Sequence, residues 1–430
     1  MCKCINKCLQ MTDVEISLKT RIRKARAKFA AMAGTYFVGV FNDNFFKQSA
    51  MLMAVAAGKS YLQGYATVIF TLPFILLAAQ AGWLADRFSK RSVVIGAKVL
   101  ELTAMIFGAL GVIYGSWILI LVMLGVGGIQ AAIFSPALNG SIPELYPAEY
   151  VLTANAIIRM ISTAAILAGI ASAGFVLDIK GFIGQMPLNL AAVSALVIGV
   201  SVGGVLMSFG VARFPAAAPA VRFPWKGPLE TLKVLYRTRF APLLAIAIVA
   251  NAFFWFIGAL EVLVLNQLGI SQFKFSNSMT SGLIVAELVG IAAGGLLSIY
   301  FAKKIKWYRL LAPLAVILAV SMLLIVVVPY LYGSAKLIYL FAVLAIMGVA
   351  GGMYAIPLEA FIQVRPAADC KGATIAAANF AAFSGILLSG PVLNLFNVLN
   401  ITPSNDFAIM GAMTLMVALF LYIFLRGNKE

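Results

Sequence analysis

The stretch Gly82-Trp-Leu-Ala-Asp86-Arg87-Phe-Ser-Lys90-Arg91 lies at the end of an apolar run. Gly82 permits two helices to approach closely, and the charges that follow mark the point where the chain leaves an apolar environment. Asp86 can accept hydrogen bonds from the N-terminus of a neighbouring helix and can pair with a cation, which would stabilise one of two conformations. We therefore interpret this stretch as a conformational element between two helices.

The composition outside this stretch is that of a membrane protein. Of the 430 residues, 63% are hydrophobic and only 11% are charged. Soluble globular proteins are usually about 45–50% apolar and about 25% charged. A single core cannot hide so much apolar surface from water, so the composition indicates a polytopic helical membrane protein.

Apolar stretches of the length that crosses a bilayer, about 20 residues, recur along the whole chain. Twelve spans are predicted: Phe29–Ala56, Tyr61–Leu84, Val93–Tyr114, Ser116–Leu138, Val151–Leu177, Pro187–Val211, Phe240–Leu265, Ser276–Tyr300, Leu310–Tyr330, Leu337–Phe361, Gly372–Phe396 and Phe407–Leu425. The predicted fold class is an all-α membrane protein with twelve transmembrane helices in two six-helix bundles.

The net charge of +17 has its origin in loops between the apolar spans. We therefore assign it to orientation in the membrane and expect no nucleic-acid partner. Lys and Arg gather before the first span and in alternate loops, which predicts that both termini face the cytoplasm. The expected parts are a basic segment 1–28, a bundle 29–211, a cytoplasmic linker 212–239 and a second bundle 240–430. Within the linker, Trp225, Leu229, Leu232 and Tyr236 recur at helical spacing and favour an interfacial helix over an ordinary linker.

The two halves of the chain repeat one another. Gly82 and Gly295 both begin the last turns of a span, and they lie 295 − 82 = 213 residues apart. Pro136 and Pro357 follow glycine pairs in the fourth and tenth spans, 357 − 136 = 221 residues apart. Both offsets are near half the chain length, as expected for two bundles related by an axis along the membrane normal.

A polar cluster interrupts the first span, where residues 41–47 read Phe-Asn-Asp-Asn-Phe-Phe-Lys. An ionisable group within an apolar span is costly in lipid and marks a candidate functional site. We single out Asp43 with its neighbours Asn42 and Asn44. The alternative is a local pair between Asp43 and Lys47, which lies one helical turn later.

Other polar residues within the spans extend the candidate site. The candidate substrate-binding residues are Asn42, Asp43, Asn44, Asn155, Arg159, Asn251, Glu261 and Asn379. The candidate coupling or gating residues are Asp86, Arg87, Arg91, Glu101, Glu144, Glu287 and Glu359. Glu101 follows Lys98 by one turn, which favours a local ion pair, and Glu261 and Glu287 are candidate partners or proton sites.

The motif at 82–91 resembles the loop motif of the major facilitator superfamily. A narrower resemblance, to the lysophospholipid transporter family, rests on Phe41-Asn-Asp-Asn-Phe, Phe134-Ser-Pro-Ala-Leu-Asn-Gly-Ser-Ile-Pro-Glu144, Thr153-Ala-Asn155-Ala and Gly351-Gly-Met-Tyr-Ala-Ile-Pro-Leu-Glu359. The resemblance implies inward movement of lysophospholipid or a similar amphiphile across the bacterial inner (plasma) membrane by alternating access. The implied partners are that amphiphile, membrane lipids and a functional partner acyltransferase. It implies no cofactor and no metal.

The chain departs from the pattern of that family at three positions. Leu138 stands where the family has a basic residue, and the charges near Arg159 and Glu261 are exchanged. Arg159 is therefore open to two interpretations. It can bind a phosphate through two hydrogen bonds, or it can pair with an acidic side chain, namely Asp43, Glu101 or Glu261.

The absence of histidine excludes catalysis by Ser-His-Asp or Cys-His groups. We therefore expect no enzyme. The alternative transport function is proton-coupled export of drugs or small organic molecules, with Asp43 or Glu287 as the proton carrier. An acyltransferase or an anchoring partner is the alternative from another class of protein.

Overall fold

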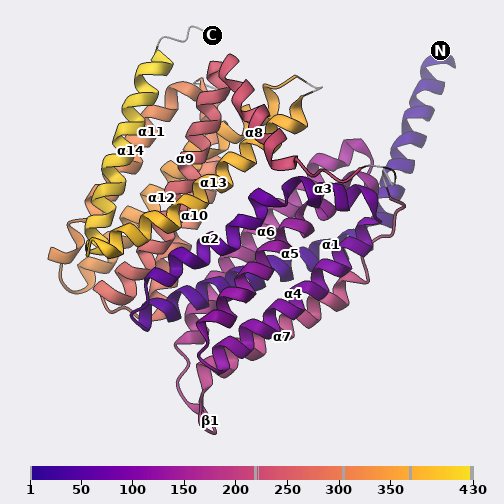
Figure 1. Ribbon diagram of the computed structural model, residues 1–430. Coiled ribbons are helices and arrows are strands. Elements are labelled where there is room, and N and C mark those ends of the chain that lie inside the picture. Colours follow the sequence, from indigo (N-terminus) through magenta and orange to yellow (C-terminus); the bar gives the residue numbers. More distant parts are fainter. Residues whose placement is uncertain (1, 217–219, 221, 303–305, 368–369, 427–430) are drawn as a thin grey trace. The chain divides into compact units, whose positions relative to one another are not determined.

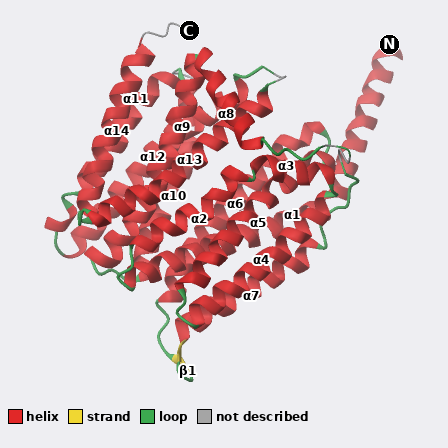
Figure 2. Ribbon diagram, in the orientation of Figure 1, coloured by secondary structure: helices red, strands yellow, loops and turns green. Residues whose placement is uncertain are grey.

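The computed structural model describes residues 2–216, 220, 222–302, 306–367 and 370–426, and almost all of them are helical (Figures 1 and 2). The α-helices are α1 (Cys2–Ala56), α2 (Tyr61–Leu76), α3 (Ala78–Arg87), α4 (Lys90–Ile113), α5 (Trp117–Leu145), α6 (Ala148–Leu177), α7 (Leu188–Ser208), α8 (Gly227–Arg237), α9 (Pro242–Gln267), α10 (Asn277–Ala302), α11 (Trp307–Ile325), α12 (Gly333–Val364), α13 (Lys371–Val398) and α14 (Pro403–Arg426). Short helical turns η1 (Thr238–Phe240), η2 (Leu268–Gln272) and η3 (Val328–Tyr330) flank α9 and α11. A hairpin of β1 (Phe182–Ile183) and β2 (Met186–Pro187) joins α6 to α7.

Every predicted span overlaps one of these helices, except that the second span is divided between α2 and α3. These two helices meet at a bend of 54°. Leu77, at the break, leaves helical geometry (φ −106°, ψ 2°). Within the described residues, ten helices are long and apolar enough to cross a membrane, and the α2–α3 pair makes an eleventh. α1, which contains the polar cluster, is not among them.

The chain forms two compact units, and some helices contribute residues to both of them. Unit 1 comprises residues 1–44, 77–169 and 194–225, and unit 2 comprises residues 45–76, 170–193 and 226–430. α1 is therefore divided between the units after Asn44, α6 after Gly169, and α7 before Ser194. Unit 2 combines segments from both halves of the sequence.

Unit 1 is built around α5. α4 packs on α5, and α3 contacts both. Phe134, Leu138 and Ile142 of α5 are buried against Val94 of α4 and Phe29 of α1. Burial of such side chains stabilises the unit where the helices face one another rather than lipid.

Unit 2 contains a close helix crossing between α10 and α12. A Cβ added at Gly294 would collide with the carbonyl of Val349, and one added at Gly352 would collide with the carbonyl of Ile291. Only glycine permits this approach, so the glycines of the tenth predicted span have a packing role. Elsewhere in the unit, α11 packs on α14, and α13 packs on α9 and α2.

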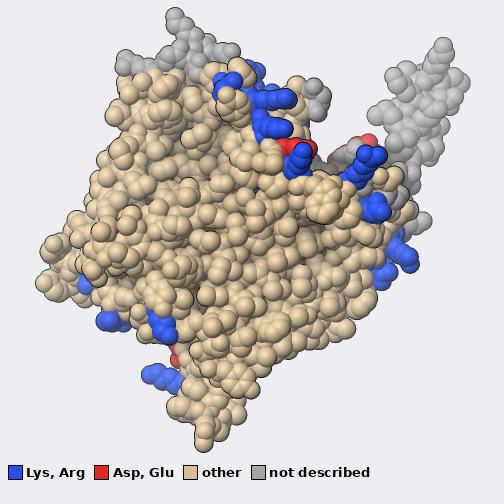
Figure 3. Space-filling model, in the orientation of Figure 1, with Lys and Arg blue, Asp and Glu red and all other residues tan. Residues whose placement is uncertain are grey.

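The surface matches a protein surrounded by lipid. On the face shown in Figure 3, charged side chains lie near helix ends, while the flanks between them are uncharged. Leu206, Leu296 and Leu419 are each at least 60% exposed on such flanks. α8 lies within the predicted linker. Leu229 and Tyr236 in this helix, and Trp225 just before it, are exposed.

Candidate functional site

The polar cluster of α1 contributes three consecutive side chains to three different environments. Asn42 is fully buried, and its amide nitrogen donates to Ser201 Oγ (2.8 Å) and to the Val197 carbonyl (3.2 Å) of α7. Asn44 donates to the Val40 carbonyl one turn back along α1 (2.8 Å). Asp43 is half-buried. The geometry thus gives Asn42 and Asn44 partners within unit 1 and leaves Asp43 as the charged member of the cluster.

A buried ion pair lies next to Asn42. Lys98 Nζ and Glu101 Oε2 are 2.5 Å apart, and both side chains are fully buried, as their spacing on α4 predicted. Gln130 of α5 donates to Glu101 Oε2 (3.3 Å), and Asn42 donates to Oε1 (3.5 Å). Both carboxylate oxygens therefore have donors, which is what a buried charge requires. This arrangement stabilises the interior of unit 1.

Small residues make room for Lys98. Its ammonium lies 4.8 Å from the centre of the Phe134 ring, and a Cβ at Gly39 of α1 would collide with Nζ. The cation therefore faces an aromatic ring, a carboxylate and a gap left by glycine. The sequence pattern missed Gln130 and Ser201, although each is a polar residue in an apolar span.

Arg159 and Asn155 lie on α6, and both side chains are exposed in unit 1. They are one turn apart, and Thr163, one further turn along, is exposed as well. The three side chains therefore form a polar stripe on a helix that is long and apolar enough to cross a membrane. An arginine in such a span suits an anionic group that it can bind through two hydrogen bonds.

Glu261 of α9 and Glu287 of α10 both lie in unit 2. Both are buried, with 3% and 5% of their surface exposed. One carboxyl oxygen of each, Glu261 Oε1 and Glu287 Oε2, has no hydrogen-bond partner among the described residues.

A second buried polar group in unit 2 is a chain of amides that the sequence interpretation did not include. Gln48 of α1 donates to Asn266 Oδ1 of α9 (2.8 Å), and Asn266 donates to Gln63 Oε1 of α2 (3.1 Å). Gln63 in turn donates to the Leu263 carbonyl (3.4 Å). All three amides are buried, so the chain links α1, α2 and α9 within unit 2.

Asp178, just after α6, binds the N-terminus of α10. Its Oδ1 accepts from the backbone and side-chain amides of Asn277 (3.0 and 2.9 Å), and its Oδ2 accepts from the Ser278 amide (2.8 Å). Burial of the carboxyl raises its pKa, but the hydrogen bonds from Ser278 and Asn277 together outweigh burial and hold the pKa below its ordinary value. A carboxylate at a helix N-terminus also interacts favourably with the helix dipole.

The charged residues of the motif at 82–91 contact different partners in unit 1. Asp86 is exposed at the end of α3, and Arg87 lies over the Trp83 ring (5.6 Å). Lys90 pairs with Glu144 of α5, and Arg91 donates to the Phe209 carbonyl after α7 (2.8 Å). Lys90 and Arg91 therefore fasten the start of α4 to α5 and to the end of α7.

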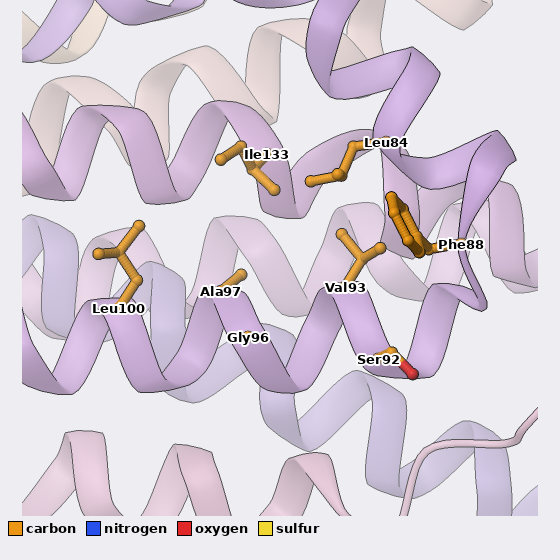
Figure 4. A pocket seen from close by; sticks show the side chains of 8 residues that line it. All are labelled: Leu84, Phe88, Ser92, Val93, Gly96, Ala97, Leu100 and Ile133. Atoms are coloured by element: carbon orange, nitrogen blue, oxygen red, sulfur yellow. The ribbon is translucent and has the colours of Figure 1, made fainter.

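An apolar hollow of about 320 Å³ lies between α3, α4 and α5 (Figure 4). It is lined by Leu84, Phe88, Ser92, Val93, Gly96, Ala97, Leu100 and Ile133. The Ser92 hydroxyl is the polar side-chain group in this lining, so the hollow suits an acyl chain rather than a charged headgroup.

The remaining candidates of unit 2 lie apart along their helices. Asn251 of α9 is buried, and its Oδ1 has no hydrogen-bond partner among the described residues. Phe254, three residues on, stacks on Tyr354 of α12 with ring centres 6.0 Å apart, so it faces another helix. Asn379 of α13 is exposed and Glu359 of α12 is half-buried.

Comparison with known proteins identifies the class. A family model described as the Major Facilitator Superfamily matches residues 29–390. The chain belongs to the major facilitator superfamily. This match confirms the resemblance of residues 82–91 to the superfamily's loop motif, and it confirms the predicted all-α membrane fold.

Solved transporter structures share the fold. A D-xylose–proton symporter matches with a TM-score of 0.71 at 15% identity, over 93% of this chain and 97% of that one. A bacterial homologue of the human lysosomal transporter Spinster matches with a TM-score of 0.65 at 14% identity, over 92% and 95%. These matches establish the architecture of this superfamily member.

The curated relatives are more specific. The lysophospholipid transporter LplT of Serratia proteamaculans is 27% identical over 344 residues, covering 76% of this chain and 78% of the relative. LplT of Photorhabdus laumondii is 28% identical over 351 residues, covering 77% and 79%. The superfamily member described here is therefore similar to lysophospholipid transporters over most of its length.

Proposed function

We propose that this protein moves lysophospholipid, or a similar amphiphile, across the bacterial inner membrane. The observation that carries the proposal is the similarity to curated LplT transporters over 76% of the chain. The chain is a transporter-family protein with ten or eleven membrane-spanning helices among its described residues. In this proposal it acts by transport rather than catalysis, and a separate acyltransferase uses the lipid it delivers.

The headgroup is bound by charged side chains of unit 1. Arg159 and Asn155 form the exposed polar stripe of α6, and Asp43 is the half-buried acid of α1. A guanidinium binds a phosphate through two hydrogen bonds, and a carboxylate binds an ammonium. A zwitterionic lysophospholipid headgroup carries both groups, while its acyl chain stays against apolar helix flanks or lipid.

Transport uses alternating access between two six-helix bundles, 29–211 and 240–430, with both termini in the cytoplasm. Rocking of the bundles exposes the headgroup site to either side of the membrane. The loop that contains Asp86 stabilises one end state. Membrane lipids surround the helices throughout the cycle.

The test is uptake of labelled lysophosphatidylethanolamine into proteoliposomes, beside a panel of drugs and metabolites. We expect uptake of the lysolipid and a loss of at least about tenfold in Arg159→Ala, because a charge-assisted pair contributes about 1.5–3 kcal/mol. Arg159→Lys keeps the charge but loses the bidentate geometry and should retain part of the uptake. Arg213→Ala, which removes an exposed cation of the linker, is the matched control and should transport normally. Uptake of drugs without uptake of lysolipid would overturn the proposal.

A further inference from the structure

The linker helix α8 packs on unit 2 with only one of its sides. Gly227, Pro228, Thr231, Val234 and Leu235 are buried or half-buried, whereas the other residues of the helix are exposed. The chain turns by about 100° at each residue, so Thr231, Val234 and Leu235 point to the same side. α8 contacts α13 and α2, and this is the side that it presents to them. Among the described residues, the opposite side of α8 is uncovered.

A stripe of large apolar side chains runs along the uncovered side. Leu229, Leu232 and Tyr236 recur at spacings of three and four residues, and they are 58%, 44% and 62% exposed. Phe240 of η1 follows after four more residues and is 77% exposed. We call these four residues the α8 stripe. Contact with water is unfavourable for such a surface, so a contiguous exposed patch marks an interaction site.

Basic side chains lie beside the α8 stripe. Lys226, Lys233 and Arg237 recur at spacings of seven and four residues, so they share one side of the helix, about a quarter turn from the stripe. All three are exposed. Glu230 is the acidic residue of α8, and it lies further from the stripe than these cations do. The charge next to the stripe is therefore positive.

A further cation lies at the end of the α8 stripe. Arg239 Cζ is 3.8 Å from the centre of the Tyr236 ring and 4.6 Å from the centre of the Phe240 ring, so the guanidinium contacts both aromatic members of the stripe. Residues 226–240 contain four basic residues and one acidic residue, a net charge of 4 − 1 = +3. Figure 3 shows Lys and Arg side chains gathered over this part of the chain.

The membrane is within reach of the α8 stripe. α8 ends at Arg237, and α9, which is long and apolar enough to cross a membrane, begins at Pro242. A chain of 242 − 237 = 5 residues spans at most about 18 Å when fully extended. An exposed apolar side with Lys and Arg beside it is typical of a helix at the headgroup level of a bilayer, where the cations bind anionic lipids.

We infer that α8 is a docking surface for anionic phospholipid in the membrane leaflet that α9 enters. The α8 stripe lies among the acyl chains nearest the headgroups, while Lys226, Lys233 and Arg237 bind lipid phosphates. Glu230, further from the stripe, stays toward water. Because α8 packs on α13 and α2, the bound lipid stabilises the linker against these helices. This surface does not depend on which molecule the protein transports.

Insertion of the stripe is tested by quenching of a fluorophore with lipid. In the full chain with its four native cysteines changed to Ser, Leu232→Cys places bimane on the stripe, and Glu230→Cys places it at an exposed position of the same helix outside the stripe. Both proteins are reconstituted into nanodiscs of phosphatidylcholine and phosphatidylglycerol with brominated acyl chains. We expect quenching at Leu232→Cys to exceed that at Glu230→Cys by at least about twofold, because only the stripe reaches the acyl chains.

The preference for anionic lipid is tested by moving the bromine between the two lipids at equal mole fractions. Brominated phosphatidylglycerol should quench the Leu232→Cys label at least about twice as strongly as brominated phosphatidylcholine, because each Lys or Arg near the surface favours anionic lipid by about fivefold. Lys233→Gln with Arg237→Gln should remove this preference. Lys59→Gln with Lys180→Gln removes two exposed cations outside α8 and is the matched control, which should keep it. In the protein without charge variants, raising the salt from 0.1 M to 1 M shortens the screening length from about 10 Å to about 3 Å and should weaken the preference.

Equal quenching at the two label positions would overturn the docking of α8. Weak quenching of both labels, with the Leu232→Cys label shielded from aqueous iodide, would show that a protein surface covers the stripe and would overturn it as well. Equal quenching by the two brominated lipids would overturn the assignment to anionic lipid. A preference that persists at 1 M salt, or in Lys233→Gln with Arg237→Gln at the native unfolding midpoint, would overturn the role of the α8 cations.

Discussion

Asn42, Asp43 and Asn44 are consecutive, yet the structure uses them differently. Each residue of an α-helix is rotated by about 100° from the last, so three neighbours point in three directions. Asn42 turns inward to α7 and Glu101, while Asn44 bonds to its own helix. The sequence identified the cluster, but the direction of each side chain depends on the neighbouring helices.

The Lys98–Glu101 pair gives a prediction at this scale. Lys98→Met should destabilise the protein by about 3–5 kcal/mol, because it leaves the Glu101 charge buried without its cation. The double variant Lys98→Met with Glu101→Gln should recover most of that loss, since no charge then remains to be compensated. Thermal unfolding in detergent measures both effects.

The exposed Lys233 of α8 provides the control, and Lys233→Met should change stability by less than about 0.5 kcal/mol. If Lys98→Met proved as stable as the native protein, the pair would have no structural role.

The amide chain of Gln48, Gln63 and Asn266 shows why part of the site escaped prediction. Each residue is a neutral polar group in a mainly apolar stretch, and no spacing connects them in the sequence. They meet only because α1, α2 and α9 pack together in unit 2. Such a contact depends on tertiary structure, whereas the Lys98–Glu101 pair lies on one helix and was predictable from spacing.

At the scale of single elements, the N-terminus of α10 depends on Asp178. Asp178→Asn removes the charge and one pair of acceptor sites, and it should cost about 1 kcal/mol at neutral pH. The measurement is the thermal unfolding midpoint of the purified protein. Asp86→Asn, at an exposed aspartate, is the matched control and should change the midpoint little.

The same contact has a defined pH dependence. The pKa of the Asp178 carboxyl in the folded protein lies below its ordinary value of 3.8, so folding favours the ionised form. Its stabilising contribution is complete above the unfolded pKa and is lost as pH falls through the folded pKa. The stability difference between the native protein and Asp178→Asn should therefore stay constant from pH 8 to about pH 5 and shrink below about pH 4. A difference that grew on acidification would contradict this role.

The α10–α12 crossing is a second element with a measurable requirement. Gly352→Ala places a methyl group against the Ile291 carbonyl and should cost about 1–3 kcal/mol through overpacking. Gly258→Ala in α9 meets nothing within 4 Å and should be neutral or stabilising by up to about 1 kcal/mol. Equal unfolding midpoints for the two variants would show that the crossing tolerates a wider separation.

The ends of helices were predictable from the sequence wherever an apolar stretch gives way to polar residues. A helix in the linker, and helical structure at each predicted span, followed from apolar periodicity and run length, although α1 is not among the ten or eleven described helices able to cross a membrane. The break at Leu77 did not, because residues on both sides of it are apolar and helix-forming in character. A bend that leaves composition unchanged gives no signal to a pattern based on hydropathy.

At the scale of the whole molecule, charge and hydropathy together determine the class but not the chemistry. Apolar flanks and charged helix ends are common to the superfamily, so they identify a membrane transporter of any substrate. The substrate proposal depends instead on similarity to particular relatives and on a few embedded side chains such as Arg159. Those few residues are where the transport function has to be tested.

Membrane topology is the last prediction. Arg365 and Cys370 lie in the loop after α12, and Lys371 begins α13. Lys180 is the basic residue that precedes the β1–β2 hairpin, so the charge bias predicts that Cys370 faces the cytoplasm and the hairpin faces outside. Five helices able to cross a membrane, α7 and α9 to α12, separate the two sites. In a chain with Cys2, Cys4 and Cys8 changed to Ser, an impermeant maleimide should label the exposed Cys370 in inside-out vesicles but not in intact cells.

The reciprocal variant carries Phe182→Cys, at a 72% exposed position of β1, with Cys370→Ser in the same background. It should be labelled in intact cells and protected in inside-out vesicles, because an odd number of crossings places the two sites on opposite sides. Labelling of both cysteines from the same side would mean that one of the five helices does not cross the membrane. That result would also contradict the two-bundle arrangement, because six crossings in each half require an odd number of crossings between these two loops.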